Sequence, residues 1–245
     1  MRAVFRMAGR SRCISVALVG LVTTLLAPFI ATEALYGFAL HDLGGPPTVP
    51  VTRALPRLAQ AAFWLHGGEG PPLVAEPMPA WRWAWALLLD RRALLQERKG
   101  WRAASLAARC WLADRAVAPR GVGWHLAFWA ATVWTSSHFD AAQMTQVWME
   151  GAWFGRGARG IDAAAGVYFG RPVNDLAPQE LVLLVALETA PRRFDPYCRP
   201  GQAVAVRNSL LRRLLTSGFL TDVEYQSAVT QPLGVVQGDC EERSR

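Results

Sequence analysis

The feature that most constrains this chain is an uncharged apolar run close to its N-terminus. Residues 13–32 carry no charged side chain, and the segment before them contains Arg2, Arg6, Arg10 and Arg12. About 20 residues, at a rise of about 1.5 Å each, cross a bilayer core of about 30 Å. The run therefore predicts one membrane-spanning helix. The arginines before it favour a cytoplasmic N-terminus, with the rest of the chain outside.

A cleaved signal peptide is the alternative interpretation of this run. It would need a shorter apolar region and a small-residue cleavage site, whereas the residues that follow, TEALYGFAL, offer a poor one. We therefore expect a single-pass protein of the cytoplasmic (inner) membrane, whose domain lies in the periplasm or outside the cell. The expected divisions are a cytoplasmic basic tail at 1–12, a transmembrane helix with its exit at 13–40, a Gly- and Pro-rich linker at 41–50, a folded domain at 51–235 and a C-terminal tail at 236–245.

The formal net charge of +7 comes almost entirely from arginine, because Lys99 is the only lysine. Guanidinium groups bind pairs of phosphate oxygens and stay ionised, so this composition favours phosphate or diphosphate ligands and anionic membrane surfaces. Nucleic acid is the competing partner for any basic chain. Because the charge is scattered along the sequence and not gathered in one stripe, we expect no nucleic-acid partner.

The four cysteines lack the spacing of a zinc site, so no metal site is expected from them. Cys13 opens the apolar run. Cys198 and Cys240 lie in loop-like sequence on the expected outer side of the membrane and could pair with each other there. Cys110 belongs to an apolar helical segment, where a buried free thiol is expected.

Apolar residues recur with helical periodicity throughout the expected domain, and no long run alternates, which predicts an all-α fold. Asp140 precedes one helical segment, and Pro178 begins another that is apolar nearly all round. Thr221 and Glu224 form the capping box of the last one. The helices are expected at 55–65, 80–96, 101–117, 124–134, 141–153, 161–168, 178–188 and 203–217, and after residue 221.

Trp81, Trp83 and Trp85 are spread around the helix expected at 80–96. Core packing accounts for tryptophans in a soluble helix, and it is the favoured interpretation. A helix that rests in the headgroup region of a bilayer also selects tryptophan, so an interfacial anchor is the alternative.

The stretch WFGRGARGIDAAAGVYFGRP, residues 153–172, combines glycines, arginines and aromatic residues at close spacing. Arg156 and Arg159 flank glycines that would let the backbone approach an anion closely. The same glycines would serve a tight connection between helices, through left-handed turns. This structural interpretation is the favoured one.

The same stretch and the residues after it resemble the glycosyltransferase family 51 domain, the peptidoglycan polymerase of monofunctional transglycosylases and class A penicillin-binding proteins. The pattern YFGRGA-x-GI-x-AA-x-x-YFG-x-P is met closely by Trp153–Ala158, Gly160–Ile161, Ala163–Ala164 and Tyr168–Pro172. It continues through DLAPQELVLLVALETAPRRFDP and RNSLLRRLLTSGFLTDVEYQSAV. The resemblance therefore covers roughly residues 150 to 235.

The resemblance implies a lysozyme-like α-helical domain over residues 51–235, on the outer face of the cytoplasmic membrane, with the family reaction of polymerising lipid II into glycan strands. The implied partners are lipid II or the nascent glycan strand, the membrane and other cell-wall synthesis proteins. The only cofactor that the resemblance suggests is a divalent cation. Because the chain contains no Ser-x-x-Lys, it resembles the monofunctional type.

In the family, a glutamate of Glu-Asp-x-x-Phe-x-x-His-x-Gly is the general base, and a second glutamate in Arg-Lys-x-x-Glu assists. Aligned on the helix before the first motif, this chain has His66 and Gly67 at the Glu and Asp positions. Counting back from Phe154, the third motif falls on Trp124 and His125, with Phe128 at the second glutamate. Both expected carboxylates are therefore predicted to be missing.

Candidate ligands of the substrate diphosphate remain along the chain. Ser105 is the one familiar residue of the intervening motif, and Arg109 lies one residue from the family's lysine. Arg109 could instead pair with Asp114 or face water. The diphosphate candidates are Ser105, Arg109 and Arg156.

Three interpretations of the function follow. The favoured one is a degenerate member, a pseudoenzyme that keeps the fold and part of a groove for lipid II. The second keeps transglycosylase activity with a displaced base, for which the candidates are His66, Glu69 and Glu76. The third is a non-catalytic interaction module of the cell-wall synthesis machinery. The simpler alternative for His66 is a helix-end residue, and for Glu69 and Glu76 a solvated loop carboxylate.

One observation would help to separate these interpretations. A carboxylate at the base of a cleft lined with arginines would favour an enzyme. A cleft filled by Phe128 and the tryptophans would favour an interaction module.

Overall fold

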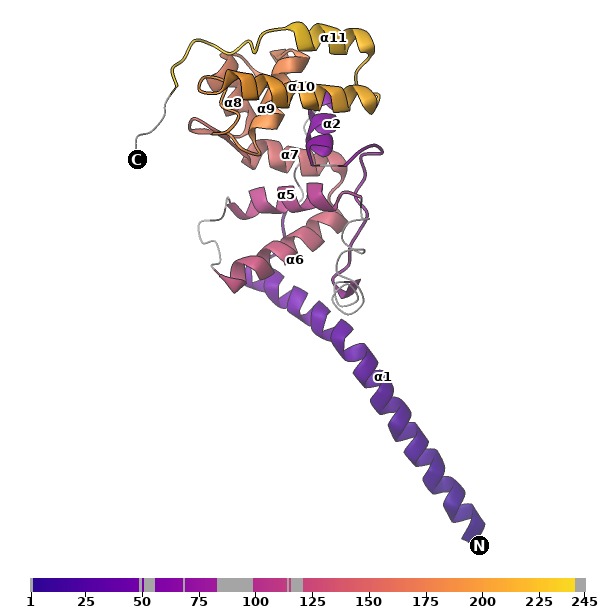
Figure 1. Cartoon of the computed structure of the whole chain (residues 1–245). Helices are drawn as coiled ribbons and strands as arrows, with labels where there is room; N and C mark the ends of the chain where they lie inside the picture. Colours follow the sequence, from indigo (N-terminus) through magenta and orange to yellow (C-terminus); the bar gives the residue numbers. More distant parts are fainter. Residues whose placement is uncertain are drawn as a thin grey trace. The chain divides into compact units, whose positions relative to one another are not determined.

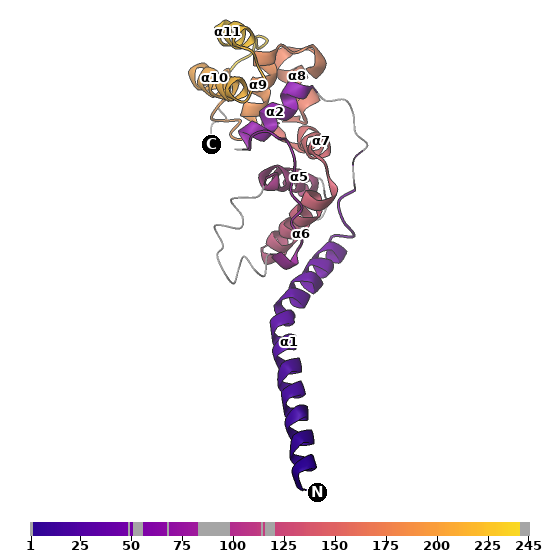
Figure 2. The same cartoon turned by 90° about the vertical axis from the view of Figure 1, so that its right-hand side faces the viewer.

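The computed structural model describes residues 2–48, 50, 56–67, 69–82, 99–113, 115 and 121–240, and for residues 2–19 it describes the backbone only. The chain divides into two compact units (Figure 1, Figure 2). Unit 1 comprises residues 1–46 and 78–97, and unit 2 comprises residues 47–77 and 98–245. Trp83 and Trp85, with most of the helix expected at 80–96, lie outside the described residues.

Unit 1 is built around the helix α1, Arg2–Asp42. Within it, Gly20–Asp42 is apolar and long enough to cross a membrane, with a mean hydropathy of 1.4 in its most apolar window. A helix suits such a span because it satisfies its backbone hydrogen bonds internally. The predicted span at 13–32 is therefore part of one continuous helix, which extends to Asp42.

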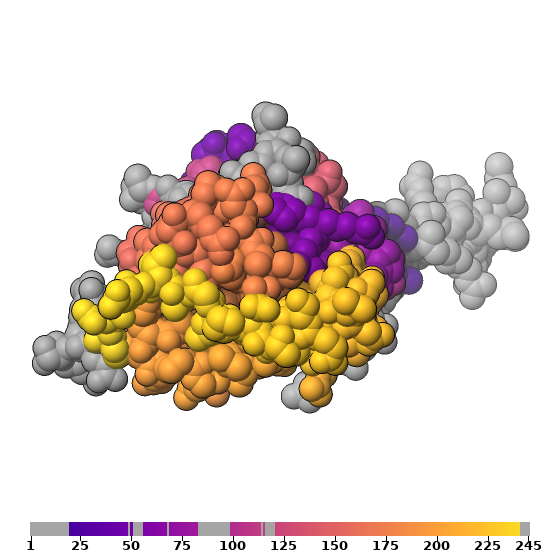
Figure 3. Space-filling view, turned by 90° about the horizontal axis from the view of Figure 1, so that it is seen from above, coloured from indigo at the N-terminus to yellow at the C-terminus, as the bar shows by residue number. Residues whose placement is uncertain are grey.

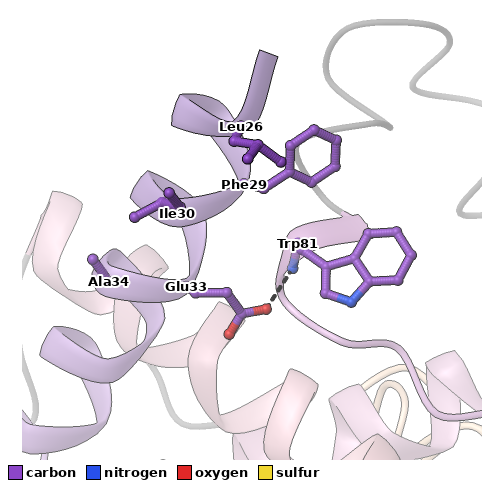
Figure 4. A pocket seen from close by; sticks show the side chains of 6 residues that line it. All are labelled: Leu26, Phe29, Ile30, Glu33, Ala34 and Trp81. Carbon is purple, nitrogen blue, oxygen red and sulfur yellow. Dashed lines mark hydrogen bonds between the residues drawn. The ribbon is translucent and has the colours of Figure 1, made fainter. Parts of the chain in front are cut away.

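Trp81 lies beside α1 within unit 1 (Figure 4). Its backbone N–H donates to Oε1 of Glu33 at 2.9 Å, and its ring centroid lies 6.3 Å from that of Phe29. The apolar hollow lined by these three residues is completed by Leu26, Ile30 and Ala34. Trp81 is 37% exposed, so it contacts α1 without belonging to a core.

The core of unit 2 forms around α9, Pro178–Leu187. Every residue from Leu181 to Leu187 is buried, as expected for a helix that is apolar nearly all round. α9 packs against α2 (Arg57–His66) and α10 (Pro200–Thr216). The second group of packed helices comprises α5 (Trp101–Ala113), α6 (Val122–His138) and α7 (Ala141–Gly151). Because α2 also contacts α7, the two groups share one core.

Helices begin where the sequence predicts caps. At the start of α7, Asp140 accepts the Gln143 N–H at 2.8 Å, and the Gln143 side chain accepts the Asp140 N–H at 2.8 Å. Thr221 and Glu224 form the predicted capping box of α11, Asp222–Thr230. The elements between them include α8, Ile161–Phe169, and the short 3-10 helix η1, Val173–Asp175. The described part of the chain thus confirms the all-α prediction, apart from one small hairpin.

That hairpin lies in the stretch that begins at Trp153. Strand β1, Trp153–Gly155, pairs antiparallel with β2, Ala158–Arg159. The turn holds Arg156 at φ +50° and Gly157 at φ +77°. Gly155 must be glycine, because its φ is +86° and a β-carbon there would lie 2.9 Å from Cβ of Pro191. Periodicity could not predict strands this short, but the glycines do supply the left-handed turns expected of them.

The residues after α11 lie along the surface of unit 2. We call residues 231–240 the C-terminal strap, which is yellow in Figure 3. At its start, the guanidinium of the buried Arg207 donates to the carbonyls of Gln231 and Pro232 at 3.0 and 3.1 Å. Further along, the Val236 N–H donates to the carbonyl of Tyr168 at 2.9 Å. The residues expected to form the C-terminal tail, from 236 on, thus contact the domain at Val236.

A disulfide joins Cys198 to Cys240 and fixes the far end of this strap. The pairing that the sequence left open is thus present. Cys110 is a buried free thiol, as predicted. Since disulfides persist in oxidising compartments, this pairing agrees with a domain outside the cytoplasm.

Candidate functional site

His66 ends α2, as the simpler interpretation of its sequence position predicts. Its Nε2 forms a hydrogen bond with Oγ1 of Thr189. Burial lowers the pKa of the imidazole to about 4, and the positive charges of Arg213 and Arg102 contribute in the same direction. His66 is therefore neutral at pH 7 and only weakly basic.

Glu69 caps the start of α5 and is not a solvated loop residue. Its carboxylate accepts the N–H of Gly100 at 2.6 Å and the N–H of Arg102 at 2.8 Å, one bond on each oxygen. Burial raises the pKa of Glu69, and the backbone N–H groups of Arg102, Gly100 and Ala103 oppose that shift. A carboxylate at a helix N-terminus also suits the positive end of the helix dipole. Both oxygens are thus used by the fold.

Glu76 is exposed and belongs to the same loop. Its backbone N–H donates to the carbonyl of Lys99 at 2.9 Å. The neighbouring Gly100 has φ +79°, and a β-carbon there would collide with the backbone of Ala75. The loop before α5 is therefore held close to the helix, with the Glu76 side chain in solvent.

The two predicted diphosphate ligands of α5, Ser105 and Arg109, lie on one face of that helix together with Arg102, which the sequence analysis did not predict. Arg102, Ser105 and Arg109 are spaced at i, i+3 and i+7, which places them in one row. The Ser105 hydroxyl donates to the carbonyl of Arg102 at 2.8 Å, and Arg109 is exposed. Asp114, the proposed partner of Arg109, lies outside the described residues.

Glu188 is a carboxylate in this region that no sequence motif indicated. It is the C-cap residue of α9 and is half-buried. Burial raises its pKa, whereas the indole of Trp148 and the guanidinium groups of Arg109 and Arg102 act in the opposite direction. Glu188 therefore lies within electrostatic range of two arginines of α5.

These charges are near one another without being paired. Within the described ranges, neither Arg102 nor Arg109 forms an ion pair with a carboxylate. The indole N–H of the fully buried Trp148 has no acceptor in normal hydrogen-bond geometry among the same residues. The group to which we refer below as the Glu188 cluster consists of Glu188, Thr189, His66, Arg102 and Arg109.

Arg156, by contrast, is fully engaged by the fold. Its guanidinium forms two hydrogen bonds with the Asp195 carboxylate, at 3.0 and 3.1 Å, and donates to the carbonyl of Asp239 at 3.0 Å. It also lies over the ring of Tyr197, 4.1 Å from the centroid. This geometry favours a structural role for Arg156 over the diphosphate binding expected of it.

Phe128, at the predicted place of the second glutamate, stacks on Trp124 one turn earlier in α6. The two ring centroids are 5.1 Å apart and the planes are nearly parallel, at 8°. His125 contacts the same tryptophan edge-on at 5.2 Å. This end of α6 therefore presents aromatic surface in place of a carboxylate.

The residues that the structure describes include no ready site for the divalent cation that the resemblance suggests. Across the described part of the chain, no three His, Cys, Asp or Glu side chains lie together as a metal site. The charged groups near the expected active site include Arg102, Arg109, Arg213, Glu69 and Glu188.

A comparison with protein families relates part of this domain to a known family. Residues 122–215 match the family model described as Transglycosylase. This part of the chain is similar to the transglycosylase family. The matched transglycosylase segment contains Phe128 and Glu188 and begins after His66, Glu69 and α5.

The relatives of the transglycosylase segment include large proteins. Penicillin-binding protein 1A of Aquifex aeolicus is 39% identical over 97 residues, which are 40% of this chain and 13% of that protein. Penicillin-binding protein 1A of Pseudomonas aeruginosa is 35% identical over 91 residues, and that of Escherichia coli is 32% identical over 91 residues. In each case these residues are 37% of this chain and 11% of the relative. This chain therefore corresponds to a small part of each relative.

A solved structure is also similar to part of the chain. The crystal structure of penicillin-binding protein 1A from Haemophilus influenzae covers 58% of this chain and 18% of its own, at 20% identity and a TM-score of 0.36. That score is too low for a comparison of side-chain geometry.

A weak sequence signal did exist for Glu188. The run LVLLVALE places a charged residue directly after seven apolar ones, and such a residue is expected to emerge at the edge of the core. The run does not reveal that this edge faces α5. That proximity depends on packing between segments far apart in the sequence.

Proposed function

We propose that this chain is a membrane-anchored protein of the transglycosylase type, which binds lipid II or the nascent glycan strand and is impaired as a polymerase. The transglycosylase segment and the relatives named penicillin-binding protein 1A support this substrate class. The apolar part of α1 supports the anchor.

The observation that carries the impairment is the state of His66. It occupies the expected place of the general base, and with a pKa of about 4 it binds a proton too weakly to serve well at neutral pH. Glu69 is used to cap α5, Glu76 faces solvent, and Phe128 replaces the second glutamate. A positioned base contributes about 10² to 10⁴-fold to rate, so we expect a comparable loss of polymerisation.

For the diphosphate of the substrate we propose the row on α5. Arg102 and Arg109 have no ion-pair partner within the described residues, and Ser105 lies between them. Guanidinium groups bind phosphate oxygens strongly, and a serine hydroxyl adds a further contact. Arg156 is unsuited to this role because Asp195 already occupies its guanidinium.

For the orientation we propose that the N-terminus is cytoplasmic and the domain lies in the periplasm or outside. Four arginines precede the span, and such residues favour the cytoplasmic side. The Cys198–Cys240 disulfide supports the same orientation, because it requires an oxidising compartment.

The test uses the full chain, purified in detergent, with fluorescently labelled lipid II. We expect measurable binding and no processive glycan polymer. Replacing Arg109 by Ala should weaken binding by about tenfold, because one phosphate contact contributes about 1.4 kcal/mol. The matched control is Arg212→Ala, an exposed arginine of α10, which should bind like the native chain.

Two results would contradict the proposal. Processive polymer at the rate of an intact transglycosylase would refute the impairment. No binding of lipid II at any accessible concentration would refute the substrate class.

A further inference from the structure

We propose that Glu188 accepts the proton of the attacking sugar hydroxyl in a slow, single glycosyl transfer at the Glu188 cluster. This inference rests on the proposed function, because it requires a lipid-linked sugar diphosphate as donor. It assigns a catalytic residue outside the positions of the family motifs. Processive polymerisation is not part of it.

The first argument is position. His66 occupies the place where the resemblance puts the general base, and it is hydrogen-bonded to Thr189, the residue that follows Glu188. The end of α9, where Glu188 lies, is therefore next to the end of α2.

The second argument is that the fold gains little from a charge here. Glu188 is the C-cap residue of α9, and the carbonyl groups at a helix C-terminus disfavour negative charge. Partial burial disfavours the charge as well. The Trp148 indole and the charges of Arg109 and Arg102 favour the charged form, but burial outweighs them, because the pKa of Glu188 remains raised. A carboxylate kept where folding disfavours it is a candidate for a functional group.

The third argument is the indole of Trp148. Its N–H is fully buried and reaches no acceptor in normal geometry among the described residues, although it lies close enough to influence Glu188. Buried N–H groups are normally paired. A small rotation of Glu188 when a ligand binds, or a ligand oxygen itself, would give this donor its acceptor.

The fourth argument is the cationic row beside the carboxylate. Arg102 and Arg109 are seven residues apart on α5, which places them about 10 Å apart along the same helix face. Both guanidinium charges act on Glu188. The cluster therefore combines a proton acceptor with two cations that can hold a diphosphate.

The proposed step balances as follows. A hydroxyl oxygen of the acceptor sugar forms a bond to the anomeric carbon of the donor, and its proton passes to the carboxylate of Glu188. The bond between that carbon and the diphosphate oxygen breaks, and the electron pair leaves with the diphosphate, where Arg102 and Arg109 stabilise the charge. Glu188 then releases the proton to water.

The experiment measures one transfer between two lipid II molecules, as lipid-linked tetrasaccharide detected by mass spectrometry after long incubation. The native full chain should form this product slowly. Glu188→Gln should lower the rate by at least about 100-fold, because the amide cannot accept the proton. Glu150→Gln, at the exposed end of α7, is the matched control and should leave the rate unchanged.

Further readouts separate a proton acceptor from a merely structural carboxylate. Glu188→Gln should bind labelled lipid II at least as tightly as the native chain and should melt at the same temperature or higher. The native transfer rate should rise with pH as Glu188 ionises. The groups that influence this ionisation are Arg102 and Arg109 from α5 and Trp148 from α7, and His66 of α2 lies nearby. Glu188→Asp should recover part of the rate.

The possible failures are distinguishable. If the native chain binds lipid II but forms no tetrasaccharide, or if Glu188→Gln transfers at the native rate, this inference is wrong and the proposed function stands. If the native chain does not bind lipid II, the proposed function itself is wrong.

Discussion

The imidazole of His66 is hydrogen-bonded to the hydroxyl of Thr189, although 123 residues separate them in the chain. This contact joins the end of α2 to the residues that follow α9. It also places the residue that follows Glu188 next to His66, the predicted position of the family's general base. The arginines whose charges act on His66 are Arg213 of α10 and Arg102 of α5.

The His66–Thr189 contact should contribute to stability. Thr189→Val keeps the shape of the side chain and removes the hydroxyl, so we expect the free energy of unfolding to fall by about 0.5–1.5 kcal/mol. Guanidinium denaturation in detergent measures it. The control is Thr230→Val, whose hydroxyl bonds only to carbonyls of its own helix, and equal effects in both variants would contradict the prediction.

His66 should make the domain less stable in acid. The pKa of His66 is about 4 in the folded state and near 6.5 when unfolded. Between these values the unfolded chain binds a proton that the folded chain does not, so the free energy of unfolding falls as the pH falls from about 6.5 to about 4. Over that window the melting temperature of the native chain should fall more steeply than that of His66→Gln. Parallel curves would exclude this role for His66.

Glu69 should matter for stability in a way that Glu76 does not. Glu69→Ala leaves the first N–H groups of α5 without their acceptor, which typically costs about 1 kcal/mol. Glu76→Ala removes an exposed carboxylate and should have little effect. Denaturation of the two variants measures the free energy of unfolding of each. An equal loss of this free energy in both variants would show that Glu69 does not cap α5.

Loss of the Cys198–Cys240 disulfide should destabilise unit 2. The bridge closes a loop between residues 42 positions apart, and bridges of this kind contribute about 2–4 kcal/mol. The double variant Cys198→Ser/Cys240→Ser should unfold at lower denaturant concentration than the native chain. Reductant should shift the native curve to that of the variant and leave the variant unchanged. A native curve insensitive to reductant would mean that the bridge has no such role.

Local sequence was sufficient for the features that short-range interactions decide. The capping box of Thr221 and Glu224 and the continuous burial of α9 follow from spacing within one helix. The hairpin from Trp153 to Arg159 was missed because its strands are too short to show alternation. Its glycines nonetheless indicated the turns.

The candidate site was harder to predict because distant segments assemble it. Glu69 accepts hydrogen bonds from backbone N–H groups more than thirty residues later in the chain, and no local sequence pattern predicts such a cap. Glu188 comes within electrostatic range of Arg102 and Arg109 because α9 and α5 belong to one core. The motif alignment predicts the place of the general base at His66, and it contains nothing about Glu188.

The bridge between Cys198 and Cys240 also determines how the domain would bear mechanical load. Tension applied at residue 240 passes through the two sulfur atoms to the foot of α10, so the hydrogen bonds made by Arg207 and Val236 carry almost none of it. Without the bridge, the same force would break these hydrogen bonds one after another. After reduction, the C-terminal strap should therefore detach from the domain at a lower force than when the disulfide is intact.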